Sequence, residues 1–322
     1  MRDVIAMPSS ERVYNVAIIG AGRIAAGFDS PDSEEVLTHA HAFSKNPRTR
    51  LSGFFDVDRA KARAEAARWK TEAFESLEAL LEHAPDVVVI ATPDETHADL
   101  LRKLNERRVS LIVCEKPVAT NRDELAALAS LRTPVIVNFR RRFDPTVVAL
   151  RQDLVRGEHG RIITAVGSYS KGLLHNGSHL IDLARFLFGE MTSHLLLANT
   201  NDWSGGNTVS AFLSFERCEQ FHLVAGDERA YSLFELDVLT EKRRFRFTDE
   251  GFALTTERAV PDPVFKGFTV LGNPQREKTA LMQAMKRMAA HVVEVLEDAD
   301  PVSSLRDAMA TQEACFCILG DK

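Results

Sequence analysis

The chain has 322 residues, of which 45% are hydrophobic and 27% are charged, and its formal net charge is −6. This composition is that of a globular protein with about two domains, and the negative balance argues against general binding of nucleic acid or anionic membranes. No run approaches the roughly 18 apolar residues that cross a bilayer, so we expect neither a membrane nor nucleic acid as a partner.

Residues 1–12 carry mixed charges and lack the apolar segment of a signal peptide, so we expect a loosely ordered tail there. The cysteines have neither the spacing of metal ligands nor that of a disulfide framework; they are Cys114, Cys218, Cys315 and Cys317. We therefore expect a cytoplasmic protein with no metal site.

A strand-to-turn pattern opens the first domain. Four apolar residues, Val16–Ile19, precede Gly20-Ala21-Gly22-Arg23-Ile24-Ala25. A dinucleotide pyrophosphate requires such a turn, in which Gly20 permits the bend, Gly22 lets the backbone approach and Ala25 keeps helix and strand in contact. The expected helix that follows would offer free N–H groups to the phosphates. We predict that Gly20, Gly22, Arg23 and Ile24 bind a cofactor, with a plain tight turn as the alternative.

Apolar runs then alternate with amphipathic stretches as far as residue 140. The runs are Val13–Ile19, Leu51–Phe55, Val87–Ala91, Leu111–Cys114 and Val135–Phe139, and the stretches are Arg59–Trp69, Leu77–His83, Thr96–Arg107 and Arg122–Leu131. Continuous apolar strands separated by helices predict a parallel sheet covered on both faces, that is, a doubly wound α/β domain of the Rossmann type. Asn121 followed by Glu124 predicts a capped helix start.

The pattern changes after residue 140. We expect helices at Pro145–Arg156 and Ser178–Phe188, strands at Ile162–Tyr169 and in the alternating region 193–260, and closing helices at Gln275–Leu296 and Ser303–Leu319. The prediction is a dinucleotide-binding domain over 13–140 and an α+β domain over 141–322. The second domain would carry a large open mixed or antiparallel sheet for substrate binding and oligomerisation.

The ribose contact of a dinucleotide fold is expected from an acidic residue after the second strand. Asp56 is the candidate, but it lies 56 − 20 = 36 residues beyond Gly20, which the polar segment 28–35 explains as an inserted loop. A carboxylate there favours NAD because it would repel a 2′-phosphate, while Arg59 and Lys61 leave NADP possible. A solvated carboxylate at a helix start is the alternative.

Several short motifs together resemble the Gfo/Idh/MocA family of oxidoreductases, which includes glucose–fructose oxidoreductase and inositol dehydrogenase. They are Ala91-Thr92-Pro93 with His97, Cys114-Glu115-Lys116-Pro117, the segment 138–145, Gly157 with Gly160, and the segment 177–183. The resemblance implies that Thr92, Pro93, His97 and Glu115 contact the cofactor. It also implies that Lys116 hydrogen-bonds the reacting oxygen and that a cis peptide precedes Pro117.

The proton carrier is also implied by the resemblance. His179 matches the family's histidine in Asp-x-x-x-His, but the aspartate position is occupied by His175. The two imidazoles could share the proton transfer, or His175 could contact substrate. Asp182, one helical turn further on, could hold His179 in one tautomer. A structural histidine at a helix start is the alternative for His179.

Further candidates for substrate contact are Tyr169, Lys171, Arg142, Asn176 and Asp182. One of Arg140, Arg141 and Arg142 could pair with a diphosphate or carboxylate, although such arginines more often join domains, which we favour for at least two of the three.

These features predict an NAD(P)-dependent oxidoreductase that acts on a secondary alcohol or ketone of a sugar, cyclitol or sugar nucleotide. The resemblance also implies a homodimer or homotetramer. Two alternatives stay open: a non-catalytic nucleotide-binding regulator or scaffold of the same fold, and a reductase of a non-sugar carbonyl or imine.

Overall fold

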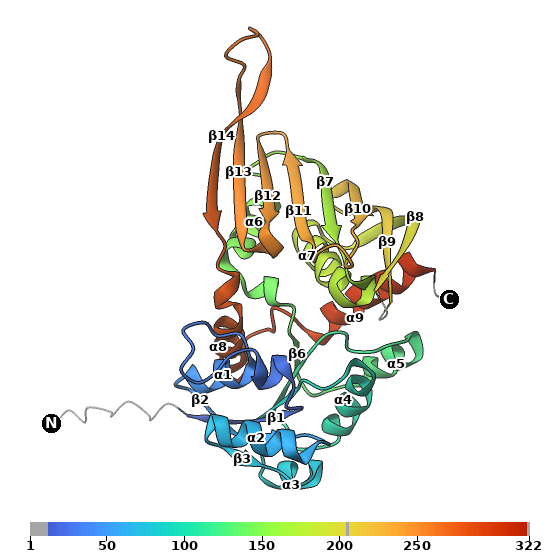
Figure 1. The fold of residues 1–322 in the computed structure, drawn as a ribbon. Coiled ribbons are helices and arrows are strands. Elements are labelled where there is room, and N and C mark those ends of the chain that lie inside the picture. Colours follow the sequence, from blue (N-terminus) through green and yellow to red (C-terminus); the bar gives the residue numbers. More distant parts are fainter. Residues whose placement is uncertain (1–11, 204–205, 321–322) are drawn as a thin grey trace, which may run out of the picture.

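The computed structural model describes residues 12–203 and 206–320, and two large sheets organise this part of the chain (Figure 1). The first sheet has six strands in the order β3-β2-β1-β4-β5-β6, all pairing in parallel. This is the order of a dinucleotide-binding Rossmann sheet, as predicted. Its strands are β1 (Tyr14–Ile19), β2 (Thr49–Phe55), β3 (Glu72–Ala73), β4 (Val87–Ile90), β5 (Leu111–Cys114) and β6 (Val135–Val137).

Helices cover both faces of this sheet, as the continuous apolar strands require. Every residue of β4 and β5 is buried. The helices of the first half are α1 (His39–Lys45), α2 (Arg59–Trp69), α3 (Leu77–Glu82), α4 (His97–Asn105) and α5 (Arg122–Ala127). Helix α5 begins as predicted, since the Asn121 side chain accepts a hydrogen bond from the backbone N–H of Glu124 at 2.9 Å.

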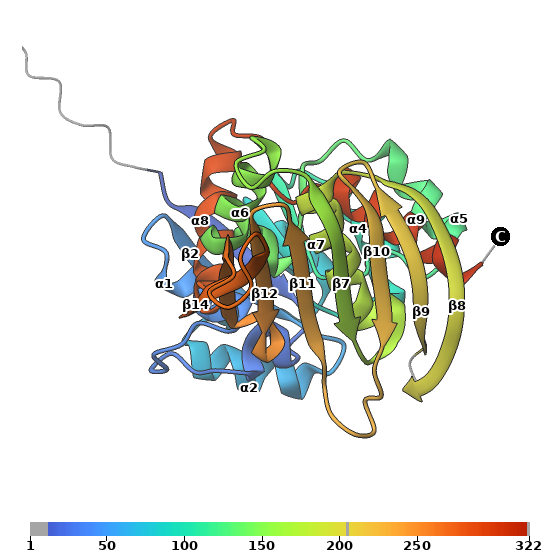
Figure 2. The same ribbon diagram turned by 90° about the horizontal axis from the view of Figure 1, so that it is seen from above.

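The second sheet has eight strands in the order β14-β13-β12-β11-β7-β10-β9-β8, and Figure 2 shows it from above. Only β10 and β7 pair in parallel, so the sheet is mixed and largely antiparallel, as predicted. Its strands are β7 (Ile162–Tyr169), β8 (Met191–Trp203), β9 (Gly206–Phe215), β10 (Cys218–Ala225), β11 (Phe234–Thr240), β12 (Arg243–Thr248), β13 (Ala253–Pro261) and β14 (Thr269–Lys278).

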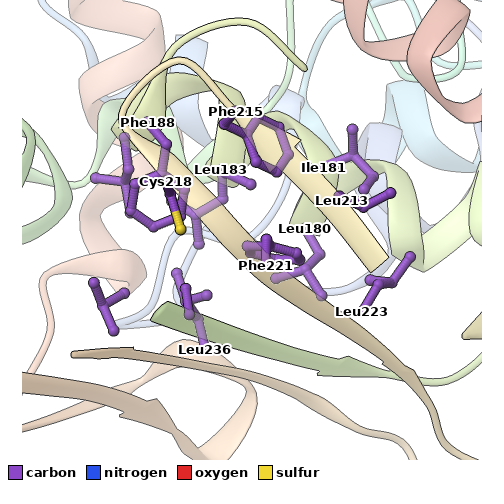
Figure 3. Packing of buried hydrophobic residues seen from close by; sticks show 14 of the residues in the cluster. Leu180, Ile181, Leu183, Phe188, Leu213, Phe215, Cys218, Phe221, Leu223 and Leu236 are labelled. Atoms are coloured by element: carbon purple, nitrogen blue, oxygen red, sulfur yellow. The ribbon is translucent and has the colours of Figure 1, made fainter. Parts of the chain in front are cut away.

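Helix α7 (Ser178–Phe188) lies against one face of this second sheet, and α6 (Pro145–Val155) packs beside it. Strands β9 and β11 alternate between buried and partly exposed residues, so one face of the sheet is covered and the other is open. Figure 3 shows Leu180 and Ile181 of α7 in the same apolar cluster as Phe215 of β9 and Phe221 of β10. This core fixes α7, and with it the site residues at the start of that helix.

The end of the chain returns to the first sheet. Helix α8 (Ala284–Leu296) buries Met285 and Met288 in the same cluster as Val16 and Ile18 of β1. Helix α9 (Leu305–Leu319) packs against α7 and also reaches β6. The C-terminal helices therefore stabilise the first sheet from the far end of the sequence. The division of the chain at residue 140 remains a prediction.

One predicted helix boundary is wrong. The sequence predicted a helix from Gln275, but residues 275–278 belong to β14 and α8 starts at Ala284. Gln275 pairs with Thr256 of β13, and Lys278 pairs with Ala253. Strand pairing with β13 thus overrides the local helical tendency of this polar segment. No helix in the described part of the chain is long and apolar enough to cross a membrane.

Candidate active site

The glycine turn lies directly after β1 at the carboxyl edge of the first sheet. Gly20 has φ +100°, and a Cβ there would collide with the carbonyl oxygen of Ala91 at the end of β4. A Cβ on Gly22 would meet nothing within 4 Å, so the backbone at that position stays open to a bound group. The predicted helix is only a five-residue turn, Arg23–Gly27, in which Arg23 is exposed and Ile24 is half-buried.

Asp56 follows β2 and lies beside this turn. Its Oδ2 accepts a hydrogen bond from the backbone N–H of Ala21 at 2.7 Å, and its Oδ1 accepts one from Asp58 at 2.8 Å. The inserted loop explains the long spacing, as predicted. Asp29 holds that loop by accepting from the Leu37 backbone and the Thr38 hydroxyl before α1 begins. The carboxylate therefore lies against the glycine turn, and its expected ribose contact stays a prediction.

His97 connects two loops of the site from a fully buried position. One ring nitrogen, Nδ1, is 2.7 Å from the carbonyl oxygen of Pro117, and the other, Nε2, is 2.9 Å from that of Thr92. Both nitrogens are thus occupied by the protein, and the ring has no edge free for a cofactor. Thr92 is half-buried and Pro93 is exposed, so both remain accessible at the sheet edge.

Glu115 and Lys116 follow β5. Oε1 of Glu115 lies 2.8 Å from His39 Nε2 and accepts a hydrogen bond from Asn138 at 2.7 Å. Burial opposes ionisation of Glu115, but these two partners hold its pKa below the ordinary value. The peptide between Lys116 and Pro117 is cis, as the resemblance implied.

Lys116 reaches across to the second half of the chain. Its Nζ donates to the carbonyl oxygen of His175 at 3.0 Å and lies 3.5 Å from the Nδ1 atom of the same residue. Burial lowers the pKa of Lys116, although the negative charges of Glu115 and Asp94 partly oppose the shift. An amine and an imidazole from opposite halves of the sequence therefore meet at one place.

His179 occupies the first turn of α7, next to this pair. Its ring packs edge-on against Phe139 with the centroids 5.7 Å apart, and it makes no hydrogen bond to other residues of the described segments. Burial, reinforced by Lys116 and then by Arg141 and Arg140, lowers the pKa of His179 far below its ordinary value. Burial and the two neighbouring lysines lower the pKa of His175 to about 4. Both imidazoles are therefore neutral near pH 7.

Three residues that were candidates for substrate contact lie elsewhere. Tyr169 is fully buried, and its hydroxyl exchanges hydrogen bonds with the backbone of Val209. Arg142 and Asp182 form a buried ion pair at 3.0 Å, so Asp182 does not hold the His179 ring as we expected. The side chains of Tyr169, Arg142 and Asp182 can lie in the packed interior because their polar atoms form hydrogen bonds or ion pairs there.

The remaining two candidates stay near the site. Lys171 has φ +73°, and its ammonium lies 3.6 Å from a carboxylate oxygen of Glu228. The Asn176 side-chain amide donates to the carbonyl oxygen of Leu233 at 3.2 Å. Both are half-buried, so they combine a structural contact with partial exposure.

Sequence reasoning missed two partners that orient Glu115. Asn138 was quoted only as part of a motif, and His39 lies in α1, a helix that was not predicted. A buried carboxylate needs hydrogen-bond partners, which is a general signal, but the sequence does not say which residues supply them.

The residues present fit a dinucleotide. The glycine turn leaves open backbone where a phosphate would approach, and it lies between β1 and β4, where the strand order reverses. Open α/β sheets bind their ligands in the crevice at this point. Asp56 lies on one side of the turn, while Glu115 and Lys116 follow β5 on the other. The described residues contain no cluster of three or more potential metal ligands.

Comparisons with known proteins agree with this geometry. Residues 14–133 match the family model of the Gfo/Idh/MocA proteins, described as an oxidoreductase family with an NAD-binding Rossmann fold. The chain is 31% identical over 193 residues to inositol 2-dehydrogenase of Rhizobium meliloti, covering 54% of each chain. It is 32% identical over 212 residues to the NAD(+)-dependent scyllo-inositol 2-dehydrogenase of Bacillus subtilis, covering 57% of this chain and 56% of the relative. The matches thus span about half the length of these curated relatives.

Solved structures match over almost the whole chain. The WlbA dehydrogenase of Bordetella pertussis, in complex with NADH and UDP-GlcNAcA, has a TM-score of 0.74 at 17% identity and covers 96% of each chain. An oxidoreductase of Agrobacterium radiobacter in complex with NAD+, L-tartaric acid and magnesium has a TM-score of 0.75 at 16% identity and covers 97% of each. At these identities the likeness supports the fold.

Proposed function

We propose that the chain is a member of the Gfo/Idh/MocA family of oxidoreductases, whose model matches residues 14–133, and that it is an NAD(P)-dependent dehydrogenase acting on secondary alcohols. The reaction interconverts an alcohol and a ketone of a sugar, cyclitol or sugar nucleotide. The observation that carries the proposal is the meeting of Lys116 with His175 and His179 at the edge of the sheet that also carries the glycine turn. The relatives that act on inositols support the substrate class.

The cofactor would be held by residues at the edge of the first sheet: Gly20, Gly22, Arg23, Ile24, Asp56, Thr92, Pro93 and Glu115. When bound, the nicotinamide supplies the acceptor or donor of the hydride. The negative charge of Asp56 favours NAD over NADP, because a 2′-phosphate would be repelled. His97 is a positioning residue in this proposal, since it fixes the Thr92 and Pro117 loops relative to each other.

His179 would exchange the proton of the substrate hydroxyl. The lowered pKa keeps the ring neutral at physiological pH, so a ring nitrogen can accept the proton during oxidation, although the same shift makes it a weaker base. Lys116 would orient the reacting oxygen through its ammonium, which already has one hydrogen on the His175 carbonyl and others free to donate. Positioning of the reacting groups contributes roughly 7–11 kcal/mol to such reactions.

His175 would act in two ways. Its carbonyl oxygen holds the Lys116 ammonium, and its ring Nδ1 at 3.5 Å from the same atom is close enough to contact the substrate. The neutral ring, with a pKa of about 4, gives the site a second hydrogen-bonding imidazole where the family usually has an aspartate.

We also propose a cytoplasmic homo-oligomer. The described cysteines are all free thiols, which suits a reducing compartment. Large apolar side chains remain exposed on β8 and on the β13–β14 hairpin, among them Leu195, Leu197, Phe265 and Phe268. Exposed apolar patches of this kind favour subunit contacts.

The test measures NADH formation by the purified protein with inositols, sugars and sugar nucleotides. We expect Lys116→Ala and His179→Ala each to lower kcat by about 10²-fold or more, as loss of an oxyanion donor or of a general base does. Lys103→Ala and His194→Ala change exposed residues of the same types and serve as controls. Wild-type rates in both site variants would remove the mechanism. A protein that binds NADH but turns over no substrate would instead support a non-catalytic regulator.

A further inference from the structure

Three consecutive arginines cross between the two sheets, and two of them are occupied by the protein. Arg142 pairs with Asp182 and Asp307 and also donates to the carbonyl oxygen of Val302. Arg141 donates to the carbonyl oxygen of Glu250 at 3.0 Å, and its guanidinium carbon lies 3.3 Å from the centroid of the Phe234 ring. These two arginines join segments of the fold, as we expected for at least two of the three.

Arg140 is different. Among residues 12–203 and 206–320 it has no hydrogen bond and no carboxylate within 4.0 Å. Its Nε atom, like that of Arg141, is buried and lacks a partner, but Arg141 has another hydrogen bond and Arg140 has none. Burial lowers the pKa of Arg140, and the negative charge of Glu115 opposes this shift only in part. A half-buried guanidinium without a counter-ion is costly, so its presence calls for a partner outside the chain.

The position of Arg140 places it at the active site. The preceding residue, Phe139, packs its ring against His179, and Asn138 holds Glu115. The positive charge of Arg140 also contributes to the lowered pKa of His179, so the two groups are within electrostatic reach of each other. Glu115 forms no ion pair with Arg140, and its Oε1 is bound by His39 and Asn138 instead.

The other charges around the site are of both signs. Lys116, Arg140 and Arg141 are the cations, whereas Lys171 is paired with Glu228. Of the acids, Glu115 has a lowered pKa, Glu250 interacts with Arg141, and burial raises the pKa of Asp94. None of these acids forms an ion pair with Arg140, so a ligand with a negative charge would supply the counter-ion that this guanidinium lacks among the described residues.

We propose that the substrate carries a carboxylate or phosphate group and that the Arg140 guanidinium binds it. The inference rests on the proposed function, because it takes the region around Lys116 and His179 as the substrate pocket. The planar guanidinium presents paired N–H donors that match the two oxygens of such a group. Arg140 is then the residue that selects acidic over neutral polyols.

The experiment measures binding, not turnover, so it separates this inference from the proposed function. The protein is saturated with NADH, which fills the nucleotide site, and ligands are titrated by isothermal calorimetry. The probes are matched sets: an aldose with its uronic acid and its 6-phosphate, and glycerol with glycerate and glycerol phosphate. We expect an acidic member to bind at least about tenfold more tightly than its neutral partner, as one charge-assisted contact provides.

Variants then identify the residue. Arg140→Met, which keeps the length but not the charge, should abolish the preference for the acid, while Arg140→Lys should retain part of it. Arg102→Gln removes an exposed positive charge from α4 and should leave the preference unchanged. NADH affinity should be the same in all variants, which also shows that they fold.

Four results would overturn the inference. They are equal or undetectable binding of acidic and neutral members in every set, a preference that survives Arg140→Met, an equal loss of preference in Arg102→Gln, and a loss of NADH affinity in Arg140→Met. If the protein prefers the carboxylate over the phosphate, or the reverse, that preference identifies which acidic group the substrate carries and supports the inference.

Discussion

The Nζ atom of Lys116, at the end of β5, lies 3.0 Å from the carbonyl oxygen of His175, which precedes α7. This hydrogen bond joins the edge of the parallel sheet to the helix that packs under the second sheet. It fixes the ammonium at a point where both imidazoles are nearby, so the reactive geometry depends on the packing of both sheets.

The buried position of Lys116 predicts an early alkaline limb in the pH profile. Its pKa lies below the ordinary value of 10.5, mainly because burial disfavours the charged form. Raising the pH therefore removes the proton, and with it a donor to the reacting oxygen, sooner than for an exposed lysine. We expect kcat/KM to fall on the alkaline side, and Lys116→Arg, whose guanidinium stays protonated, to shift or remove this fall. An identical alkaline limb in Lys116→Arg would contradict the assignment.

The two imidazoles predict acid sensitivity of the fold. The pKa of His175 is about 4 in the folded protein, below the ordinary value of 6.5, and that of His179 is shifted in the same direction. Between pH 6.5 and 4 the unfolded chain binds protons that the folded chain does not, so the free energy of unfolding falls as the pH is lowered. Urea titrations of wild type and His175→Gln should show a smaller decrease in the variant. An equal decrease in both would assign the effect to other groups.

The Arg142–Asp182 pair predicts a stability defect without a catalytic one. Both side chains are buried, so Asp182→Ala leaves the Arg142 charge with only Asp307 for compensation. Breaking a buried pair in this way costs about 3–5 kcal/mol. Denaturant unfolding should reveal this loss, and the double variant Arg142→Met/Asp182→Leu should recover part of it.

The control for this prediction is the pH profile of kcat in the folded fraction of Asp182→Ala. It should match that of the wild type, because Asp182 bonds to Arg142 and Thr311 instead of to His179. A shifted acid limb would restore the tautomer role that the sequence suggested.

Most of the fold follows from patterns that are local in the sequence. The strand Ile162–Tyr169 and the helix Ser178–Phe188 have the predicted bounds, because their apolar periodicities are unambiguous. Gln275–Lys278 was misassigned because four polar residues carry no period of their own, and the partner strand β13 decides their conformation. The packing of α8 against α1 joins segments at least 284 − 45 = 239 positions apart, and no local pattern encodes such a contact.

The candidate site shows the same division. The dinucleotide-binding pattern singled out Gly20 and Asp56, and the family resemblance singled out Lys116 and His179. The separation of Arg140 from Arg142 could not be predicted, because three identical residues in a row differ only in which neighbours surround them. Tertiary packing determines which buried polar side chains form hydrogen bonds or ion pairs with one another.

Asp56 predicts the choice of nucleotide. Its carboxylate lies at the glycine turn, accepting from the Ala21 backbone, and a 2′-phosphate would meet its negative charge. We expect Asp56→Ser to weaken NAD binding about tenfold or more, as loss of a charge-assisted hydrogen bond does, and to weaken NADP binding much less. Fluorescence titration with NADH and NADPH measures the ratio of the two affinities.

Asp58→Ser is the matched control for this change. Asp58 caps α2 by accepting from Ala60 and Lys61, and it is exposed. Serine is itself a good cap, so the variant should keep its stability and its ratio of NADH to NADPH affinity. Because loss of the Ala21 contact would weaken both nucleotides equally, only a change in the ratio supports a ribose contact by Asp56. If the ratio of NADH to NADPH affinity is unchanged in Asp56→Ser, Asp56 stabilises the glycine turn and makes no ribose contact.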